Sequence, residues 1–156
     1  AHITSYGAIP ATLQEAKHVQ AILFVNWLDD AQLTRMHETE ISGGNYSFGL
    51  LVNLNIEIEV GPSLHEIFTY VSKHGILRDT MGPIPVAEVR SKNRRRHGFS
   101  QLEVQKFTRD KISPDLKIDH FIQTSIDDPN IRLRRTERLK EFSEHFMPKS
   151  FEEISI

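Results

Sequence analysis

The sequence contains no cysteine, which excludes a disulfide framework and a cysteine nucleophile. A chain without disulfides is typical of a reducing compartment, so we expect a cytoplasmic protein. Long apolar runs are absent as well. The most hydrophobic stretch, Ala21 to Leu28, is far shorter than the roughly 20 residues that a membrane span needs. We therefore expect no association with a membrane.

A surplus of charge of either sign is also missing. The 19 Lys and Arg residues against 21 Asp and Glu residues give a formal net charge of -2, which provides no overall attraction to nucleic acid. None of the eight histidines stands at a metal-binding spacing, and the pair His37 and Glu40 supplies only two ligands. The chain has neither a glycine-rich phosphate loop nor a G-x-S-x-G nucleophile motif. These observations predict no metal site.

The hydrophobic pattern indicates strands in the first part of the chain. Four segments are expected as strands: 19–28, 46–60, 66–71 and 84–89. The first is apolar on both faces, which is typical of a central strand covered on each side. The second alternates apolar and polar residues, as in a half-buried strand, and the third is expected to return beside it as a hairpin.

Helix-start signals mark the other elements. Asp29 with Gln32 and Ser100 with Glu103 form capping-box patterns, and Asp128 precedes a proline at a first helical position. Helices are expected over 29–40, 100–111, about 115–124, and from 129 until Pro148 ends the last one. The sequence therefore predicts an α+β domain with a mixed or antiparallel twisted sheet curling toward a barrel over residues 1–112. A helical extension is expected over residues 113–156.

The helix at 29–40 carries the candidate catalytic residue. Four side chains share one stripe at positions i, i+3, i+4 and i+7: Leu33, Met36, His37 and Glu40. A carboxylate on an apolar stripe loses hydration and becomes a better proton acceptor near neutral pH, which favours Glu40 as a general base. The alternative is that Glu40 turns to solvent in a frayed last turn, because the run ISGG at 41–44 ends the helix directly after it.

Several runs occur in a characteristic order: GAIPATL at 7–13, LTRMHETE at 33–40, NY at 45–46 and IFTYV at 67–71. They resemble the middle and later part of the γ-glutamylcyclotransferase superfamily. That family has an I-A/P-A-T-I/L stretch, a strand, an L-x-x-L-D-x-x-E helix and a Tyr shortly after the Glu. The resemblance covers roughly residues 7–110 and does not include the family's N-terminal Y-G-S-N-L-type loop. His37 stands where the family usually has Asp.

The resemblance implies an enzyme that cyclises a γ-glutamyl group to 5-oxoproline and releases an amine, without a cofactor. It places Glu40 at the general acid/base position, and His37, Tyr46 and Tyr70 become candidate substrate-binding residues for a small γ-glutamyl molecule. Because the chain begins without Met and without the family's first strand, we expect a fragment. Its exposed sheet edge would be covered by a missing N-terminal segment or by a second copy.

Two other functions remain open. The same fold can serve as a non-catalytic module that binds a small ligand or a protein. A cluster of cationic residues, Arg94, Arg95 and Arg96, is a candidate anion-binding site, and it also raises the alternative of a nucleic-acid-binding protein. Nucleic acid is disfavoured because no aromatic residue interleaves with these charges, so a solvated loop is the simpler interpretation. A third interpretation pairs one of these arginines with a substrate carboxylate.

Overall fold

A computed structural model describes residues 1–41, 43–62, 64, 66–92, 94–145 and 147–155. The chain forms two compact units. The first unit comprises residues 1–11, 16–25 and 74–145, and the second comprises 12–15, 26–73 and 146–156. Within the described residues, no helix is both long enough and apolar enough to span a membrane.

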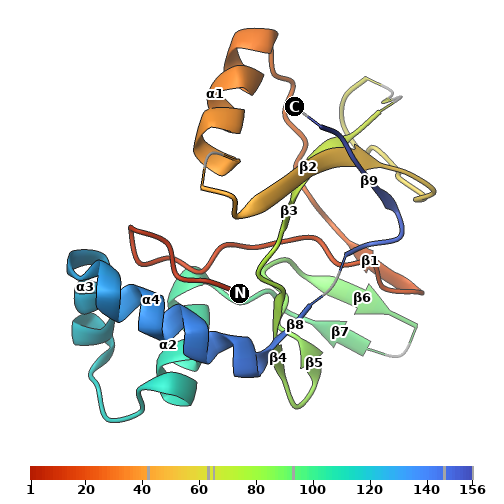
Figure 1. Cartoon of the computed structure of the whole chain (residues 1–156). Helices are drawn as coiled ribbons and strands as arrows, with labels where there is room; N and C mark the ends of the chain where they lie inside the picture. Colours follow the sequence, from red (N-terminus) through yellow and green to blue (C-terminus); the bar gives the residue numbers. More distant parts are fainter. Residues whose placement is uncertain (42, 63, 65, 93, 146, 156) are drawn as a thin grey trace. The chain divides into compact units, whose positions relative to one another are not determined.

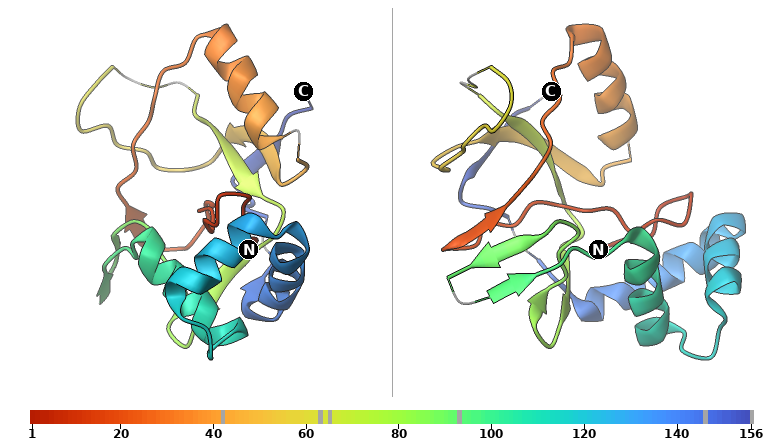
Figure 2. Two further views of the ribbon diagram at one scale, coloured as in Figure 1. Left: turned by 90° about the vertical axis from the view of Figure 1, so that its left-hand side faces the viewer. Right: turned by 180° about the vertical axis from the view of Figure 1, so that it is seen from behind.

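Three helices of the first unit pack against one another, as Figures 1 and 2 show. They are α2 (Gln101–Ile112), α3 (Ile118–Asp127) and α4 (Pro129–Leu139), and a short 3-10 helix, η1 (Lys140–Phe142), follows. The capping box at Ser100 and the cap at Asp128 are confirmed, since both side chains accept hydrogen bonds from backbone N–H groups of the first turn. Phe121, Ile112 and Leu139 are almost fully buried in the core of this unit.

Two small antiparallel sheets complete the first unit. One has the order β1-β6-β7 and is built from Val19–Ala21, Val89–Ser91 and Arg94–Arg96. The other has the order β5-β4-β8 and is built from Gly82–Pro83, Ile76–Asp79 and Ser143–Glu144. The second sheet was not predicted, because its strands are only two to four residues long and carry no recognisable alternation.

The described residues of the second unit form one helix and one antiparallel sheet. The helix is α1 (Asp30–Glu40), and the sheet has the order β3-β2-β9, with Phe68–Ser72, Tyr46–Leu51 and Phe151–Glu153. The predicted capping box of Asp29 and Gln32 is confirmed, with both reciprocal hydrogen bonds present. The predicted return of the chain beside β2 is also confirmed by the antiparallel pairing of β2 with β3.

The expected strand over 46–60 is only partly correct, because β2 ends at Leu51. Asn53 has φ 56°, a left-handed conformation that interrupts an extended chain and that Asn tolerates better than most residues. Beyond it, the alternating residues are mostly exposed and belong to no described strand. Alternation alone therefore marked an amphipathic segment without specifying a pairing partner.

The prediction of a buried central strand over 19–28 is wrong. Only Val19–Ala21 is a strand, and every residue from 19 to 28 is exposed, with Phe24 at 97%. β1 pairs with β6 alone among the described strands, so it lies at an edge of its sheet. The strand expected over 84–89 is likewise reduced to its last residue, Val89, which begins β6.

The α+β class is thus confirmed. The described residues form four α-helices and antiparallel sheets, and none of these sheets closes into a barrel. The helices expected at 115–124 and from 129 exist as α3 and α4, although α4 ends at Leu139 rather than close to Pro148. The division between residues 1–112 and 113–156 stays a prediction.

Candidate functional site

One face of α1 is half-buried and includes polar side chains. Leu33, His37 and Glu40 are half-buried at positions i, i+4 and i+7, whereas Met36 is 37% exposed. The inward stripe is therefore narrower than the sequence suggested, and Met36 lies at its margin. Glu40 is the last helical residue. The cap residue Ile41 follows it, and the Ile41 N–H donates a hydrogen bond to the His37 carbonyl.

The pairing of β2 with β3 aligns four aromatic residues, including Phe68, on one face of the sheet. Phe48 is opposite Tyr70, and Tyr46 is opposite Ser72, two positions further along. Because strand side chains alternate between faces, Tyr46, Phe48 and Tyr70 share the same face. Tyr46 is only 8% exposed, so its ring belongs to the core of the unit, and its predicted contact with a ligand stays a prediction.

His37 joins this aromatic face to α1. Its Nδ1 is 2.9 Å from the Tyr70 hydroxyl oxygen, a hydrogen bond whose direction depends on the tautomer of the imidazole. The imidazole and the Phe48 ring are in edge-to-face contact, with 4.6 Å between their centroids. The Phe68 ring stacks on the Phe48 ring. The structure thus brings together two residues, His37 and Tyr70, that the sequence had singled out 33 positions apart.

The carboxylate of Glu40 acts electrostatically on Tyr70. Burial and, to a smaller degree, the negative charge of Glu40 raise the pKa of Tyr70 above its usual value of 10.0. The phenol therefore keeps its proton near neutral pH and is able to donate a hydrogen bond. Glu40, His37 and Tyr70 together form the candidate site, which we call the α1–β3 site.

The α1–β3 site combines a proton acceptor with two groups that can exchange hydrogen bonds. A carboxylate can remove a proton from a nucleophile, while an imidazole and a phenol can orient a polar substrate. Sequence reasoning missed Phe48, which lies opposite Tyr70 in the pairing of β2 with β3. Its ring contacts the rings of both His37 and Tyr70. Among the described residues, no group of three or more His, Cys, Asp or Glu is arranged to hold a metal ion.

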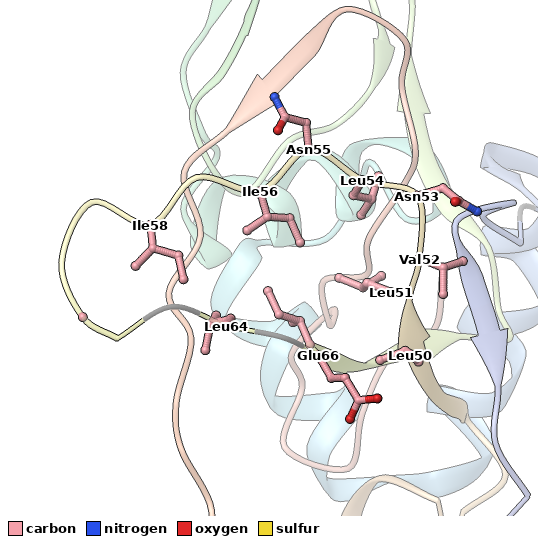
Figure 3. Close-up of a pocket in the computed structure, with 12 residues that line it drawn as sticks. Leu50, Leu51, Val52, Asn53, Leu54, Asn55, Ile56, Ile58, Leu64 and Glu66 are labelled. Carbon is pink, nitrogen blue, oxygen red and sulfur yellow. The ribbon is translucent and has the colours of Figure 1, made fainter.

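A separate hollow of about 850 Å³ lies at the far end of β2 and in the loop that follows it (Figure 3). Leu, Ile and Val residues predominate in its lining, but polar atoms make up most of the surface that faces it. Figure 3 shows Leu51 and Ile56 pointing into the hollow while Asn55 points away. Neither Glu40, His37 nor Tyr70 lines this hollow. The apolar half of the alternating segment thus faces an open space rather than a second strand.

The predicted cationic cluster lies in the first unit, on β7. Arg96 pairs with Asp79 and donates a hydrogen bond to the carbonyl of Pro83, and Arg95 pairs with Glu88. No hydrogen bond or ion pair involving the Arg94 side chain is found among the described residues. The three arginines therefore have different surroundings, and their predicted role in binding an anion stays a prediction.

Comparison of the chain with models of protein families, with curated proteins and with solved structures finds no match.

Proposed function

We propose that this protein is a γ-glutamylcyclotransferase-like enzyme that uses Glu40 as its general acid/base. The observation that carries the proposal is the half-buried place of Glu40 on the stripe of α1 that also presents His37 to Tyr70. The resemblance of residues 7–110 to that family supports the same assignment, including a fold related to its barrel-like sheet and a cytoplasmic setting. A small γ-glutamyl molecule is the proposed substrate.

The reaction is an intramolecular acyl transfer. The α-amine of the γ-glutamyl group attacks its own γ-carbonyl carbon, a new C–N bond closes the lactam, and the original amide C–N bond breaks. Glu40 accepts the proton that the attacking amine loses and returns it to the departing amine, so charge and protons balance. The nucleophile and the electrophile belong to the same substrate molecule. Holding the γ-glutamyl group in a bent conformation, with its amine close to its γ-carbonyl, therefore supplies much of the rate enhancement.

In this scheme Tyr70 contacts the substrate, and His37 positions Tyr70. The raised pKa of Tyr70 keeps its hydroxyl protonated, which suits donation to the γ-carbonyl oxygen as negative charge develops there. In this scheme His37 Nδ1–H donates to the Tyr70 hydroxyl oxygen, which holds the ring in place and leaves the single phenol proton free for the substrate. Substitution of either residue is expected to affect the rate less than substitution of Glu40, because neither accepts the transferred proton.

The alternative is a non-catalytic module that binds a small ligand or a protein. The volume of the hollow, about 850 Å³, favours a small ligand, since ligand sites are typically concave and of this size. The two functions use different residues of the second unit, so they can be separated by substitution.

A direct test measures 5-oxoproline release by mass spectrometry from a panel of γ-glutamyl amino acids, amines and peptides. We expect release by the wild-type chain and a loss of about 100-fold or more in Glu40→Gln, which keeps the shape of the side chain but cannot accept a proton. Glu38→Gln is the matched control, because Glu38 is an exposed residue of the same helix. Equal rates in the Glu40 and Glu38 variants, or no release from any substrate, would contradict the proposal.

A further inference from the structure

An ion-pair cluster on the β6–β7 hairpin of the first unit is independent of the α1–β3 site. Glu88, just before β6, is held by two arginines. Arg90 Nε is 2.7 Å from Glu88 Oε1, and Arg95 Nε is 2.8 Å from Glu88 Oε2. His97 Nδ1 lies 3.7 Å from the same Oε2 atom. One carboxylate thus lies between two guanidinium groups and an imidazole.

The register of the hairpin explains why these two arginines meet. Arg90 on β6 is directly opposite Arg95 on β7, and Gln20 of β1 is opposite Arg90 on the other side. Directly paired residues of an antiparallel sheet project from the same face, so the two guanidinium groups lie next to each other on that face. Arg94 is opposite Ser91 and projects from the other face, and so does Arg96. The sequence run Arg94–Arg96 is therefore divided between two faces.

Two like charges placed directly opposite one another destabilise a sheet unless an anion lies between them. Glu88 supplies that anion, and the hydrogen bonds from Arg95 and then Arg90 hold the pKa of its carboxyl below the usual value. The compensation is incomplete. Residues 88–97 contain five Lys and Arg residues and one carboxylate, in a chain whose formal net charge is -2.

The cluster remains accessible to a further anion. The side chains of Arg90 and Arg95 are each 57% exposed, whereas that of Glu88 is 24% exposed. Arg90 contacts Glu88 through Nε, and no hydrogen bond from its Nη groups is found among the described residues. Guanidinium groups bind phosphate through two parallel N–H donors, and phosphate offers more acceptor oxygens and more charge than a carboxylate.

We propose that Arg90, Arg95 and His97 form a binding site for a phosphate group, in which the Glu88 carboxylate is an intramolecular stand-in for the anion. A phosphate enters by replacing the carboxylate between the two guanidinium groups, and Glu88 turns outward to solvent. The recognised chemistry is the phosphate itself, which a free anion or a nucleotide can present.

The test follows the Nε–H signals of labelled arginines by nuclear magnetic resonance, with inorganic phosphate and then a nucleoside diphosphate as probes. We expect saturable shifts at Arg90 and Arg95 in the wild-type chain, and affinity about tenfold lower in Arg95→Gln and in Arg90→Gln, because each removes one charge-assisted pair. Arg94→Gln is the matched control: it removes the same charge one residue away, on the opposite face, and its affinity should change less than about twofold.

Glu88→Gln provides a second, opposite readout. Removal of the competing carboxylate should raise phosphate affinity several-fold, whereas Glu141→Gln, an exposed substitution outside the hairpin, should leave it unchanged. Circular dichroism checks that every variant retains its fold. Equal loss in the Arg94 and Arg95 variants would show diffuse attraction and overturn the site. Absence of saturable binding in both the wild-type chain and Glu88→Gln would overturn it as well.

A short single-stranded oligonucleotide separates the phosphate site from a nucleic-acid surface. The proposal expects the oligonucleotide to bind no more tightly than the nucleoside diphosphate, with a shallow dependence on salt. A steep decrease of affinity with salt indicates that several phosphates are neutralised together. That result, combined with equal sensitivity to Arg94→Gln, would replace the proposal with a nucleic-acid surface.

Discussion

The two units use their helices differently. In the first unit, α2, α3 and α4 each place at least one almost fully buried residue in the core, such as Phe121 on α3 and Leu139 on α4. In the second unit, α1 has no fully buried residue, and its inward stripe includes His37 and Glu40. Burial of large apolar side chains stabilises a fold, whereas half-buried polar groups add little to stability and are available for chemistry. We therefore expect α2–α4 to dominate stability and α1 to dominate function.

Phe121→Ala should produce the largest effect on stability. The side chain is 1% exposed, and truncation of a buried Phe costs about 3–5 kcal/mol because a cavity remains. Unfolding by denaturant, monitored by circular dichroism, measures the loss. The matched control is Phe24→Ala in the same unit, which should change stability by less than about 0.5 kcal/mol because Phe24 is 97% exposed. Similar losses for the two variants would contradict the difference between core and surface.

Acid should weaken the first unit selectively. Burial and then the neighbouring His74 lower the pKa of His2 from 6.5 to about 4. Between these values the unfolded chain binds a proton that the folded chain does not, so stability is complete above pH 6.5 and falls as the pH decreases toward 4. The pKa of His74 is lowered as well, mainly by burial. This shift also makes stability decrease as the pH falls.

The expected acid loss attributable to His2 is about 1–3 kcal/mol. Denaturant unfolding just above pH 6.5 and again near pH 4 measures it, for the wild-type chain and for His2→Gln. His2→Gln should show the smaller decrease, while His120→Gln, on the exposed side of α3, should follow the wild-type chain. An unchanged pH dependence in His2→Gln would refute the burial argument.

Substitutions in the α1–β3 site should cost less stability. Tyr70→Phe removes one hydrogen bond to His37 and should lower the free energy of unfolding by about 1 kcal/mol. Glu40→Gln should leave stability nearly unchanged but lower the pKa of Tyr70 toward 10.0, because it removes the negative charge that contributes to the increase. A spectroscopic titration of the tyrosinate measures this shift, and Glu38→Gln is the control. A loss from Tyr70→Phe as large as that from Phe121→Ala would contradict the proposed division of roles.

The elements that the sequence predicted well depend on local interactions. Asp29 and Ser100 begin helices because their side chains bond to backbone groups three residues away, and that information lies within four positions of the sequence. Strands depend on partners that are distant in the sequence. The alternation over 46–60 was therefore insufficient to show that pairing stops at Leu51, and the apolar segment 22–28 gave no sign that it would be exposed.

The same distinction holds for the sites. Helical spacing placed His37 and Glu40 on one stripe, and the predicted hairpin made Tyr70 a reasonable neighbour, so the α1–β3 site was largely predictable. The pairing of Arg90 with Arg95 required the register of β6 and β7, which the sequence does not specify. Reading Arg94–Arg96 as one cluster followed chain proximity, whereas strand alternation separates Arg95 from its two neighbours.

The most direct test of the functional assignment is to locate where a γ-glutamyl compound binds. A γ-glutamyl amino acid is titrated into the labelled Glu40→Gln variant, which should bind the compound without consuming it, and backbone resonances are followed. We predict the largest shifts at His37, at position 40 and at Tyr70. Shifts confined to the lining of the hollow at residues 50–67, with none at α1, would contradict the α1–β3 site and favour the ligand-binding module instead.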